Sequence, residues 1–520
     1  MNNLLARQPA TPSKTHAEPA PSSNSTLKLL LFGATLYLLL NLFSSPTTPY
    51  LLGGDQTFFW LGGQRMFYGE RVYMDFLRFT PPGTDIFFFL LFKLFGPQIW
   101  ATNLAVLAIG LAFTWQCFQI AAKLLPQHLA ALTAALFLIT LYGKSFSITH
   151  HWFSGLAIAF AINIALTAIT PARVAAAAAL LALATFFNQA HGAAALIAFA
   201  LFFFLRTSRG LFTPASPARN LAVLFTVYAI TFVLLSTPFL IQSGFERLWY
   251  FQVTYVMRYS SRLAQGSFLG LPNELNLHTF PKLSQYLAIY LVVPLASIYS
   301  LWSCWRERNN LSFPFDRILL LSLAGTLLCV EVARNINFVR FYAVAFPGII
   351  LFIWILSQSS RFPRYALTLL WLAVTLLAIH QTHASRAARP VTATFPGGHL
   401  ATSPELYQKL SAIAQRTHPG DSFFQAGWPG LYLPLQLHDP LFLSTVSYLE
   451  AARPEDINDT VHQLETTPVP LILWTASLDL HCPHNQRCED YLTPFRDYLA
   501  RSYTPVQTFS DGDALWQKNP

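Results

Sequence analysis

Charged residues are scarce in this chain, because Asp, Glu, Lys and Arg together make up only 11% of its 520 residues. So low a charged fraction excludes an ordinary water-soluble protein. Basic clusters are also missing, because Lys and Arg are scattered between apolar blocks although the formal net charge is +9. We therefore exclude nucleic-acid binding, and the scattered positive charge is typical of the bias that orients membrane helices.

Hydrophobic residues make up 53% of the chain, and the mean hydropathy is +0.41. These residues come in blocks of roughly twenty, the length that crosses a hydrocarbon core. We expect an α-helical polytopic membrane protein with a transmembrane domain over residues 27–384. The blocks expected to span, about eleven in number, are 27–43, 99–122, 127–142, 152–169, 174–187, 190–205, 220–241, 283–303, 316–331, 338–357 and 364–381.

A further apolar block, residues 83–95, is too short to span. As a helix it reaches about 20 Å, against about 30 Å for the hydrocarbon core. We expect it to be re-entrant or to lie at the interface. The short loops with Lys123, Arg173 and Arg306 then fall on the cytoplasmic side, as the positive-inside rule requires. The C-terminal region follows on the outer side of a cell inner (cytoplasmic) membrane.

The two ends of the chain differ from its middle. Residues 1–26 are rich in Pro, Ser and Thr and predict a disordered cytoplasmic tail. No small-residue cleavage site follows the first span, so we expect an uncleaved anchor rather than a signal peptide. Residues 385–520 contain no spanning block, and strand-like runs such as 469–474 alternate with helix-like runs such as 454–465. This alternation predicts a small soluble α/β domain outside the membrane.

Cysteine is rare, with five residues, and two of them lie in that outer domain. Cys482 and Cys488 flank a short polar loop, a spacing that favours a local disulfide in an oxidising compartment. The alternatives are two free thiols or, with His481 and His484, a metal site. The other cysteines lie in or beside membrane blocks and are most simply buried apolar residues: Cys117, Cys304 and Cys329.

A polar stretch, residues 54–76, follows the first span. Asp55 lies close to the end of that span, where an ionisable group at membrane level indicates a functional site. As an alternative, Asp55 caps a helix that begins at Thr57. Asp75 either contacts a substrate or makes a structural hydrogen bond within this outer loop, 44–82.

Basic side chains lie in other segments expected on the outer face. Arg258 and Arg262, in a second outer loop at 242–282, are four residues apart and would share one face of a helix. They either clamp a phosphate or extend to lipid headgroups. Arg334 and Arg340 are candidates for donor binding. The pair His150 and His151, at the mouth of a helix, either contacts a headgroup or anchors the chain at the interface, and His191 is a weaker case of the same kind.

An acid in one loop and arginines in another suit the transfer of a group from a phosphate leaving group. The segments Asp55-Gln56, Gly63-Gln64-x-Met66-x-x-Gly69, Tyr73-x-Asp75-Phe76 and Pro81-Pro82-Gly83 resemble the first outer loop of GT-C superfamily glycosyltransferases. The likeness is strongest to the bacterial group similar to protein O-mannosyltransferases and lipid A aminoarabinose transferases. It covers about thirty residues closely and the rest of the chain in layout.

The resemblance implies an inverting transferase that takes a sugar from a polyprenyl-phosphate donor, with Asp55 as the catalytic base. Gln56 stands where many relatives have a second acid, and Phe79-Thr80 stands where aminoarabinose transferases have an acid and a lysine. We therefore expect no cofactor and no dedicated divalent metal, and we place Gln56 at the substrate. The acceptor is a glycan, lipid or protein in the cell envelope.

Two other functions remain open at this stage. An O-antigen ligase or polymerase would carry its arginines and histidine in a large late loop and would need no acid after the first span. A lipid-carrier transporter or flippase would need a polar path through the membrane and pseudo-symmetric repeats.

Overall fold

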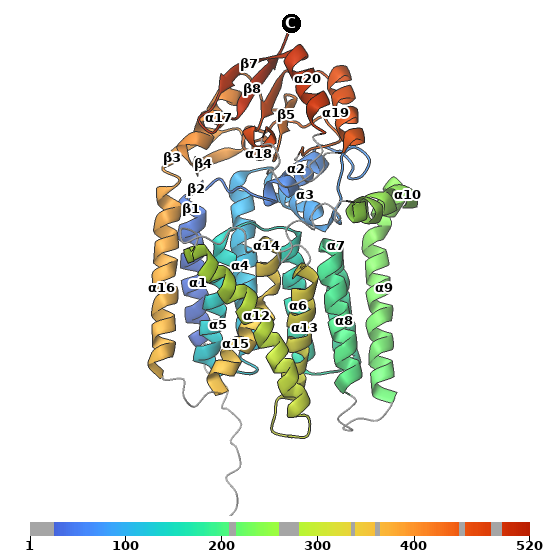
Figure 1. Ribbon diagram of the computed structural model, residues 1–520, viewed down its shortest axis with the longest axis vertical. Coiled ribbons are helices and arrows are strands. Elements are labelled where there is room, and N and C mark those ends of the chain that lie inside the picture. The colour runs from blue at the N-terminus through green and yellow to red at the C-terminus, as the bar shows by residue number, and fades with distance from the viewer. Residues whose placement is uncertain are drawn as a thin grey trace, which may run out of the picture.

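The computed structural model describes residues 25–206, 215–258, 280–333, 338–358, 364–446, 453–479 and 491–520. The expected cytoplasmic tail falls almost entirely outside these ranges and stays a prediction. Figure 1 shows a bundle of long helices, with a layer that contains the strands beyond one end of it.

The bundle is built from the apolar blocks of the sequence. Each block expected to span is helical over most of its predicted range, because helices satisfy their own backbone hydrogen bonds and so suit an apolar surrounding. The helices are α1 (Ser25–Leu42), α4 (Ile99–Ala121), α5 (Gln127–Thr140), α6 (His150–Thr167), α7 (Pro171–Phe187), α8 (Gln189–Arg206), α9 (Ala215–Ser243), α12 (Phe280–Arg306), α13 (Phe315–Ala333), α14 (Phe338–Val344), α15 (Phe346–Gln358) and α16 (Arg364–Ala387).

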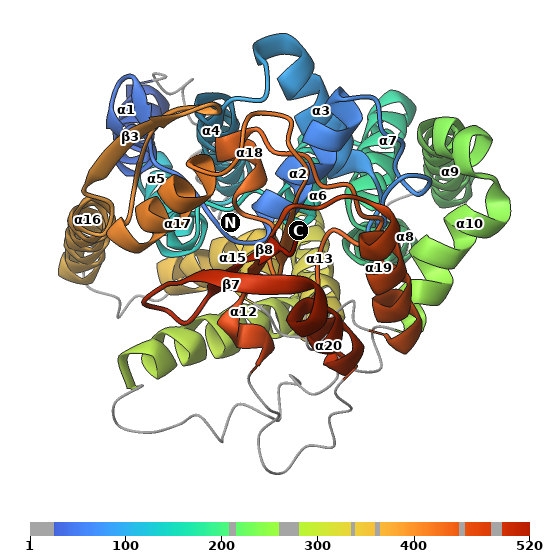
Figure 2. The ribbon, with the colours of Figure 1, turned by 90° about the horizontal axis from the view of Figure 1, so that it is seen from above.

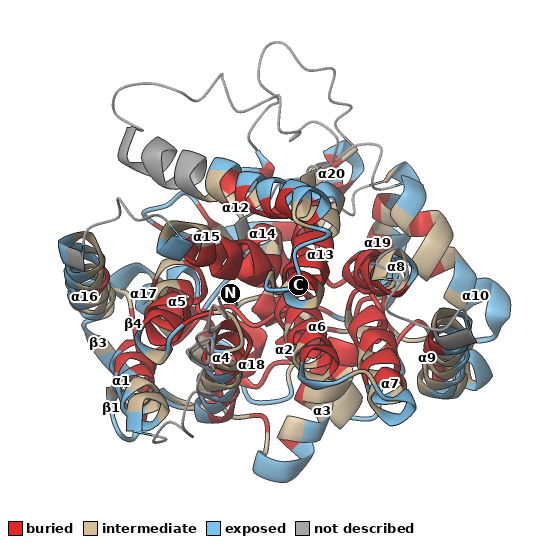
Figure 3. Cartoon of the chain, turned by 90° about the horizontal axis from the view of Figure 1, so that it is seen from below, coloured by how far each residue is buried: buried red, intermediate tan, exposed pale blue. Residues whose placement is uncertain are grey.

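Within the described part of the chain, 5 helices are long and apolar enough to cross a membrane: α1, α4, α8, α9 and α16. α9 and α16 lie at opposite edges of the bundle (Figure 2), and their outward faces are largely exposed (Figure 3). Those faces carry large apolar side chains such as Ile241 and Leu369. Apolar faces of this extent require a partner such as lipid. The count of eleven spans stays a prediction.

The predicted span 338–357 consists of two helices rather than one. Pro347 has no backbone N–H to donate to the carbonyl of Ala343, so the helical ladder is interrupted between α14 and α15. α6 passes close to this break, because a Cβ added to Gly155 would lie only 2.5 Å from the Ala343 carbonyl oxygen. The break and the glycine together bring α14 against the first turns of α6.

The first outer segment, which is the predicted outer loop 44–82 with Phe43 before it, lies between the bundle and the outermost layer (Figure 1). It contains β1 (Phe43–Ser45), β2 (Thr48–Pro49) and α2 (Gln56–Phe67), and α3 (Gly83–Phe95) follows it. α2 and α3 pack closely because Gly63 has no side chain: an added Cβ would lie 2.6 Å from the Cβ of Phe88. With 13 residues, α3 is as short as expected, and it lies beside α2.

The second outer loop, 242–282, is partly helical, which the sequence did not predict. After Gly244, whose φ is +76°, the chain forms α10 (Phe245–Trp249) and the π-helical segment η3 (Tyr250–Tyr255). The ring of Phe251 stacks on that of Tyr73, with 6.1 Å between the centroids. Aromatic packing therefore joins η3 to the first outer segment and gives this part of the loop its structure.

The C-terminal region contains strands and helices in alternation, as expected. A 4-stranded sheet has the order β5-β6-β8-β7, in which β5 and β6 are parallel and the other pairs are antiparallel. A separate antiparallel pair, β3 and β4, precedes it. The elements are β3 (Val391–Phe395), β4 (Gly398–Thr402), α17 (Pro404–Ala414), β5 (Phe423–Ala426), α18 (Tyr432–Leu435), α19 (Pro454–Thr466), β6 (Leu471–Trp474), η7 (Ala476–Leu478), α20 (Thr493–Ser502), β7 (Tyr503–Thr508) and β8 (Ala514–Lys518).

This C-terminal region is fastened to the first outer segment by buried polar contacts. The Arg65 guanidinium donates to the Leu441 carbonyl at 2.7 Å and to the Ser444 hydroxyl at 2.8 Å, and it also pairs with Asp439 at 3.3 Å. Arg65 and Asp439 are both buried, so this contact is part of a shared core. The two segments therefore pack as one unit over the end of the bundle.

Candidate functional site

Asp55 stands at the start of α2. Gly54 precedes it with a φ of +78°, a conformation that glycine adopts without strain. The carbonyl of Gly54 accepts hydrogen bonds from the Thr57 amide at 3.0 Å and from the Trp428 indole at 3.0 Å. Trp428 belongs to the C-terminal region, so both ends of the chain fix the backbone that carries Asp55.

The carboxylate of Asp55 does not cap α2. No side-chain hydrogen bond joins it to the helix N-terminus, and its own backbone is already helical, with φ −55° and ψ −24°. The capping alternative is therefore not supported. Burial raises the pKa of Asp55 above its usual value, and the positive charge of Arg340 opposes that rise. A partly buried carboxylate with an available lone pair is suited to accept a proton.

The side chain of Gln56, the residue after Asp55, lies in the protein core. Its amide nitrogen donates to the Gly53 carbonyl at 3.1 Å and to the Phe146 carbonyl at 3.3 Å, and its amide oxygen accepts from the Ile148 N–H at 3.2 Å. Gln56 is fully buried. Its hydrogen bonds thus serve the fold, joining α2 to the chain between η1 (Tyr142–Lys144) and α6.

Arg340 lies on α14, far from Asp55 in the sequence. Its charge acts on Asp55 and also on His150 and His151, at the start of α6. The ring of His150 lies 5.3 Å from that of Phe59 in α2 and 3.9 Å from that of His151, measured between centroids. Four residues that the sequence singled out are therefore brought together: Asp55, His150, His151 and Arg340.

A hydrogen-bonded chain of side chains runs from His151, through the buried His191, to the partly exposed Glu331. Its Nδ1 lies 2.9 Å from Nε2 of His191 and 3.0 Å from Nδ2 of Asn188. Nδ1 of His191 lies 2.6 Å from the Glu331 carboxylate. The chain links α6, the start of α8 and α13, and its members lie far apart in the sequence.

An apolar groove of about 370 Å³ is lined by α12, α13 and α14. α12 contributes Tyr290 and Leu295, α13 contributes Val330 and Val332, and α14 contributes Phe341. Phe341 follows Arg340 directly, and Val330 and Val332 flank Glu331. The groove is therefore next in sequence to both charged residues, and it has the apolar lining that a hydrocarbon chain needs.

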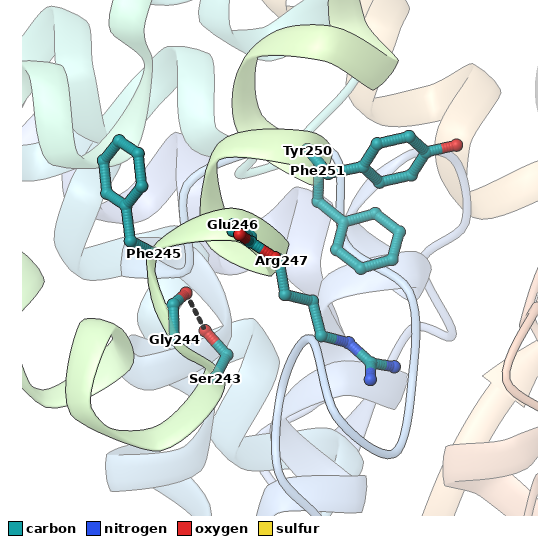
Figure 4. Close-up of a pocket in the computed structure, with 7 residues that line it drawn as sticks. All are labelled: Ser243, Gly244, Phe245, Glu246, Arg247, Tyr250 and Phe251. Atoms are coloured by element: carbon teal, nitrogen blue, oxygen red, sulfur yellow. Dashed lines mark hydrogen bonds between the residues drawn. The ribbon is translucent and has the colours of Figure 1, made fainter.

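A second, more open pocket of about 720 Å³ lies along α10, lined by residues such as Phe245, Arg247 and Phe251 (Figure 4). Arg247 donates to the Met74 carbonyl at 3.3 Å, which ties α10 to the first outer segment. This pocket is not lined by any of the four clustered residues Asp55, His150, His151 and Arg340.

Asp75 and Arg258 lie apart from the cluster in their contacts. The Asp75 carboxylate accepts from the Arg71 backbone at 2.7 Å and from its guanidinium at 3.1 Å. This contact lowers the pKa of Asp75. The structural alternative foreseen for Asp75 is thus the one observed. Arg258 is exposed, with its guanidinium 5.9 Å from the centroid of the Tyr250 ring.

Several predicted residues lie outside the described part of the chain: Arg262, Arg334, Cys482 and Cys488. Their roles stay predictions. The cysteines Cys117, Cys304 and Cys329 are buried, as expected. Among the described residues, no group of three or more His, Cys, Asp or Glu side chains is placed to hold a metal ion.

Three contributors to the site were not recognised in the sequence: Asn188, Glu331 and the pair of Arg78 with Asp85. Glu331 and Asp85 interrupt apolar helices, and an ionisable residue in such a block is itself a signal of function or of a buried partner. Asn188 gave no signal, because its role arises from the turn between α7 and α8. The contacts of Glu331 with His191 and of Asn188 with His151 depend on the packing of distant segments, whereas Arg78 and Asp85 are close in the sequence.

No family model and no curated relative matches this sequence. Solved structures match it at low sequence identity over nearly its whole length. ArnT from Cupriavidus metallidurans, bound to undecaprenyl phosphate, has a TM-score of 0.56 at 13% identity, with 95% of this chain and 98% of that chain covered. The Archaeoglobus fulgidus oligosaccharyltransferase tethered with an acceptor peptide has a TM-score of 0.52 at 12% identity, with 96% of this chain and 74% of that chain covered.

Proposed function

Because this chain has the fold of the GT-C glycosyltransferases, we propose that it transfers a sugar from a polyprenyl-phosphate donor to an acceptor hydroxyl. The sugar is a hexose or a pentose, and the acceptor is a glycan, a lipid or a protein. The reaction takes place at the outer face of the cytoplasmic membrane, below the C-terminal domain. The observation that carries the proposal is the placement of a partly buried, uncapped carboxylate, Asp55, within the electrostatic reach of Arg340.

Asp55 acts as the general base in this proposal. Its carboxylate takes the proton from the acceptor hydroxyl while the acceptor oxygen bonds to the anomeric carbon. The bond from that carbon to the phosphate oxygen breaks, and polyprenyl phosphate leaves with the electron pair. Attack from the side opposite the phosphate inverts the configuration at the anomeric carbon.

Arg340 stabilises the leaving phosphate. A guanidinium placed where negative charge develops lowers the barrier more effectively in a site from which water is excluded. The apolar groove beside Phe341 accepts the first isoprene units of the donor, so that the lipid chain and the phosphate are bound by adjacent residues. ArnT, which shares the fold, was solved with undecaprenyl phosphate bound, which supports a lipid phosphate as the ligand here.

The substitution Asp55→Asn tests the proposal. Asn keeps the size of the side chain and removes its ability to accept a proton, so turnover should fall by roughly 10²–10⁴-fold. The thermal unfolding temperature should not fall, because the carboxylate makes no hydrogen bond to the helix. The measurement is sugar transfer or release from radiolabelled polyprenyl-phosphate sugars by purified protein.

Asp497→Asn is the matched control, since Asp497 is an exposed aspartate of the C-terminal domain. It should leave turnover unchanged. Equal rates for wild type and Asp55→Asn would remove Asp55 from the mechanism and would favour the ligase or transporter instead.

A further inference from the structure

The hydrogen-bonded chain from His151 to Glu331 takes no part in the proton transfer to Asp55, yet its hydrogen bonds define a specific state of His151. Asn188 determines that state. The backbone N–H of His191 donates to Oδ1 of Asn188 at 3.1 Å. A backbone N–H donates only to the amide oxygen, so the orientation of the Asn188 amide is fixed. Its NH₂ group therefore faces Nδ1 of His151 at 3.0 Å.

This orientation decides where the proton of His151 resides. The NH₂ group of Asn188 is a donor, so Nδ1 of His151 is an acceptor and carries no proton. Nε2 of His191, which lies 2.9 Å from the same atom, must then donate to it as well. A neutral His151 consequently carries its proton on Nε2.

Glu331 balances the charge at the other end of the chain. Because Nε2 of His191 carries a proton, its 2.6 Å contact with Glu331 through Nδ1 contains one further proton, on the ring or on the carboxyl group. Both arrangements have the same net charge. The pair thus keeps the Nε2–H of His191 in place without adding charge to the site.

The Nε2–H of His151 is left as a donor. Among the described residues, no hydrogen-bond partner accepts from it. The charged or titratable groups that act on His151 are His150, His191 and Arg340, and Glu331 follows beyond His191. Arg340 is the cation of this set. An N–H group and a guanidinium in one place form a binding site for an anion.

We propose that Asn188 and His191, with Glu331 as counter-charge, are positioning residues that fix His151 as an N–H donor to the phosphate of the lipid carrier. This inference rests on the proposed function, because it takes the phosphate of the donor as the anion. The opposite tautomer of His151 would turn a lone pair toward the phosphate and repel it.

The substitution Asn188→Asp reverses the hydrogen-bond direction and keeps the rest of the contact. Asp still accepts from the His191 backbone, but its second oxygen faces Nδ1 of His151 and demands a proton there. Nε2 then loses its proton, and the dissociation constant for undecaprenyl phosphate should rise by about 10- to 100-fold at pH 8, the loss of one charged hydrogen bond.

The substitution His151→Gln supplies the control. The amide nitrogen of Gln occupies the place of Nε2 and donates whatever the state of residue 188, so this variant should retain most of the affinity. In the His151→Gln background, Asn188→Asp should have no further effect. His151→Asn, whose shorter amide does not reach the position of Nε2, should bind as weakly as Asn188→Asp at pH 8.

Binding of undecaprenyl phosphate without a sugar is measured by titration of the full-length protein in detergent, with His128→Gln, an exposed histidine, as the folding and labelling control. Equal weakening by Asn188→Asp in both backgrounds would show simple charge repulsion and overturn the inference. Failure of the wild type to bind the lipid phosphate at all would instead overturn the proposed function.

Discussion

The guanidinium of Arg78 is bound to the carboxylate of Asp85 at 2.8 Å, and both side chains are fully buried. Arg78 also donates to the Phe58 carbonyl at 2.7 Å and lies over the Phe58 ring, 3.6 Å from its centroid. Phe58 is in the first turn of α2, three residues after Asp55. The ion pair therefore connects α3 to the beginning of the helix that Asp55 precedes.

Breaking this pair should destabilise the protein strongly. Asp85→Ala leaves the Arg78 charge buried without its partner, at a cost of about 3–5 kcal/mol. The double variant Arg78→Leu with Asp85→Leu removes both charges and should recover much of this loss. Thermal unfolding in detergent measures both effects, and a double variant no more stable than Asp85→Ala would contradict the expectation.

Gly62→Ala should disturb the same pair from the other side. An added Cβ would lie 1.8 Å from the Asp85 carboxylate and 2.2 Å from the Arg78 guanidinium. Overpacking of this kind typically costs about 1–3 kcal/mol. Gly53→Ala is the matched control, because an added Cβ at Gly53 meets nothing within 4 Å. Equal unfolding temperatures for the two variants would show that α2 shifts freely.

Arg65→Met should loosen the C-terminal region from the first outer segment. The substitution leaves Asp439 buried without its cation, and burial already raises the pKa of Asp439 while Arg65 lowers it. Hydrogen exchange at residues 439–446 should speed up markedly in this variant. Arg71→Met removes only a surface ion pair with Asp75 and should leave exchange there unchanged.

The pH dependence of turnover should report on Asp55. The ionised form is the base, so the rate falls in acid as the carboxylate is protonated. Because burial raises the pKa of Asp55, the midpoint of this fall should lie above the usual aspartate value of about 3.9. Arg340→Gln removes the charge that opposes this rise, so the midpoint should move to higher pH. A shift to lower pH would contradict the electrostatic coupling.

The same shift has an opposite consequence for stability. A raised pKa means that the folded state binds the proton of Asp55 more tightly than the unfolded state does. Between the two pKa values the free energy of unfolding therefore decreases as the pH rises. Asp55→Asn should remove this part of the pH dependence.

Cys482 and Cys488 should be joined in a disulfide. In the chain-entropy description, closing so short a loop contributes about 2–3 kcal/mol. Mass spectrometry after alkylation without reduction tests the bond: two alkylated thiols would contradict it. The double substitution to Ser should lower the stability of the C-terminal domain.

The sequence was sufficient for features with local or repeated signals. Block lengths predicted the helices of the bundle, the short helix α3 and the alternation of strands and helices after residue 385. The motif around Asp55 predicted the GT-C fold, which the comparison with solved structures confirms. The break at Pro347 was readable in principle, because proline interrupts a helix.

Other features depended on contacts that no local pattern records. Gln56 has a polar amide that could bind a substrate. Only the packing of α2 on residues 146–148 shows that this amide already makes hydrogen bonds within the protein. Glu331 and His191 are 140 positions apart, and their contact follows from the packing of α8 on α13. The partner of Asp75 is Arg71, four residues earlier, so this contact could have been predicted from the sequence.

The hydrogen bond from Trp428 to the carbonyl of Gly54 makes the site and the C-terminal domain thermodynamically dependent on each other. Any ligand that binds more tightly when the Asp55 backbone is held in place must, by reciprocity, strengthen the attachment of the domain by the same factor. The converse also holds, because a partner that pulls Trp428 away weakens substrate binding equally. If the proposed site binds its substrate in this way, loss of the substrate would loosen the attachment of the C-terminal region.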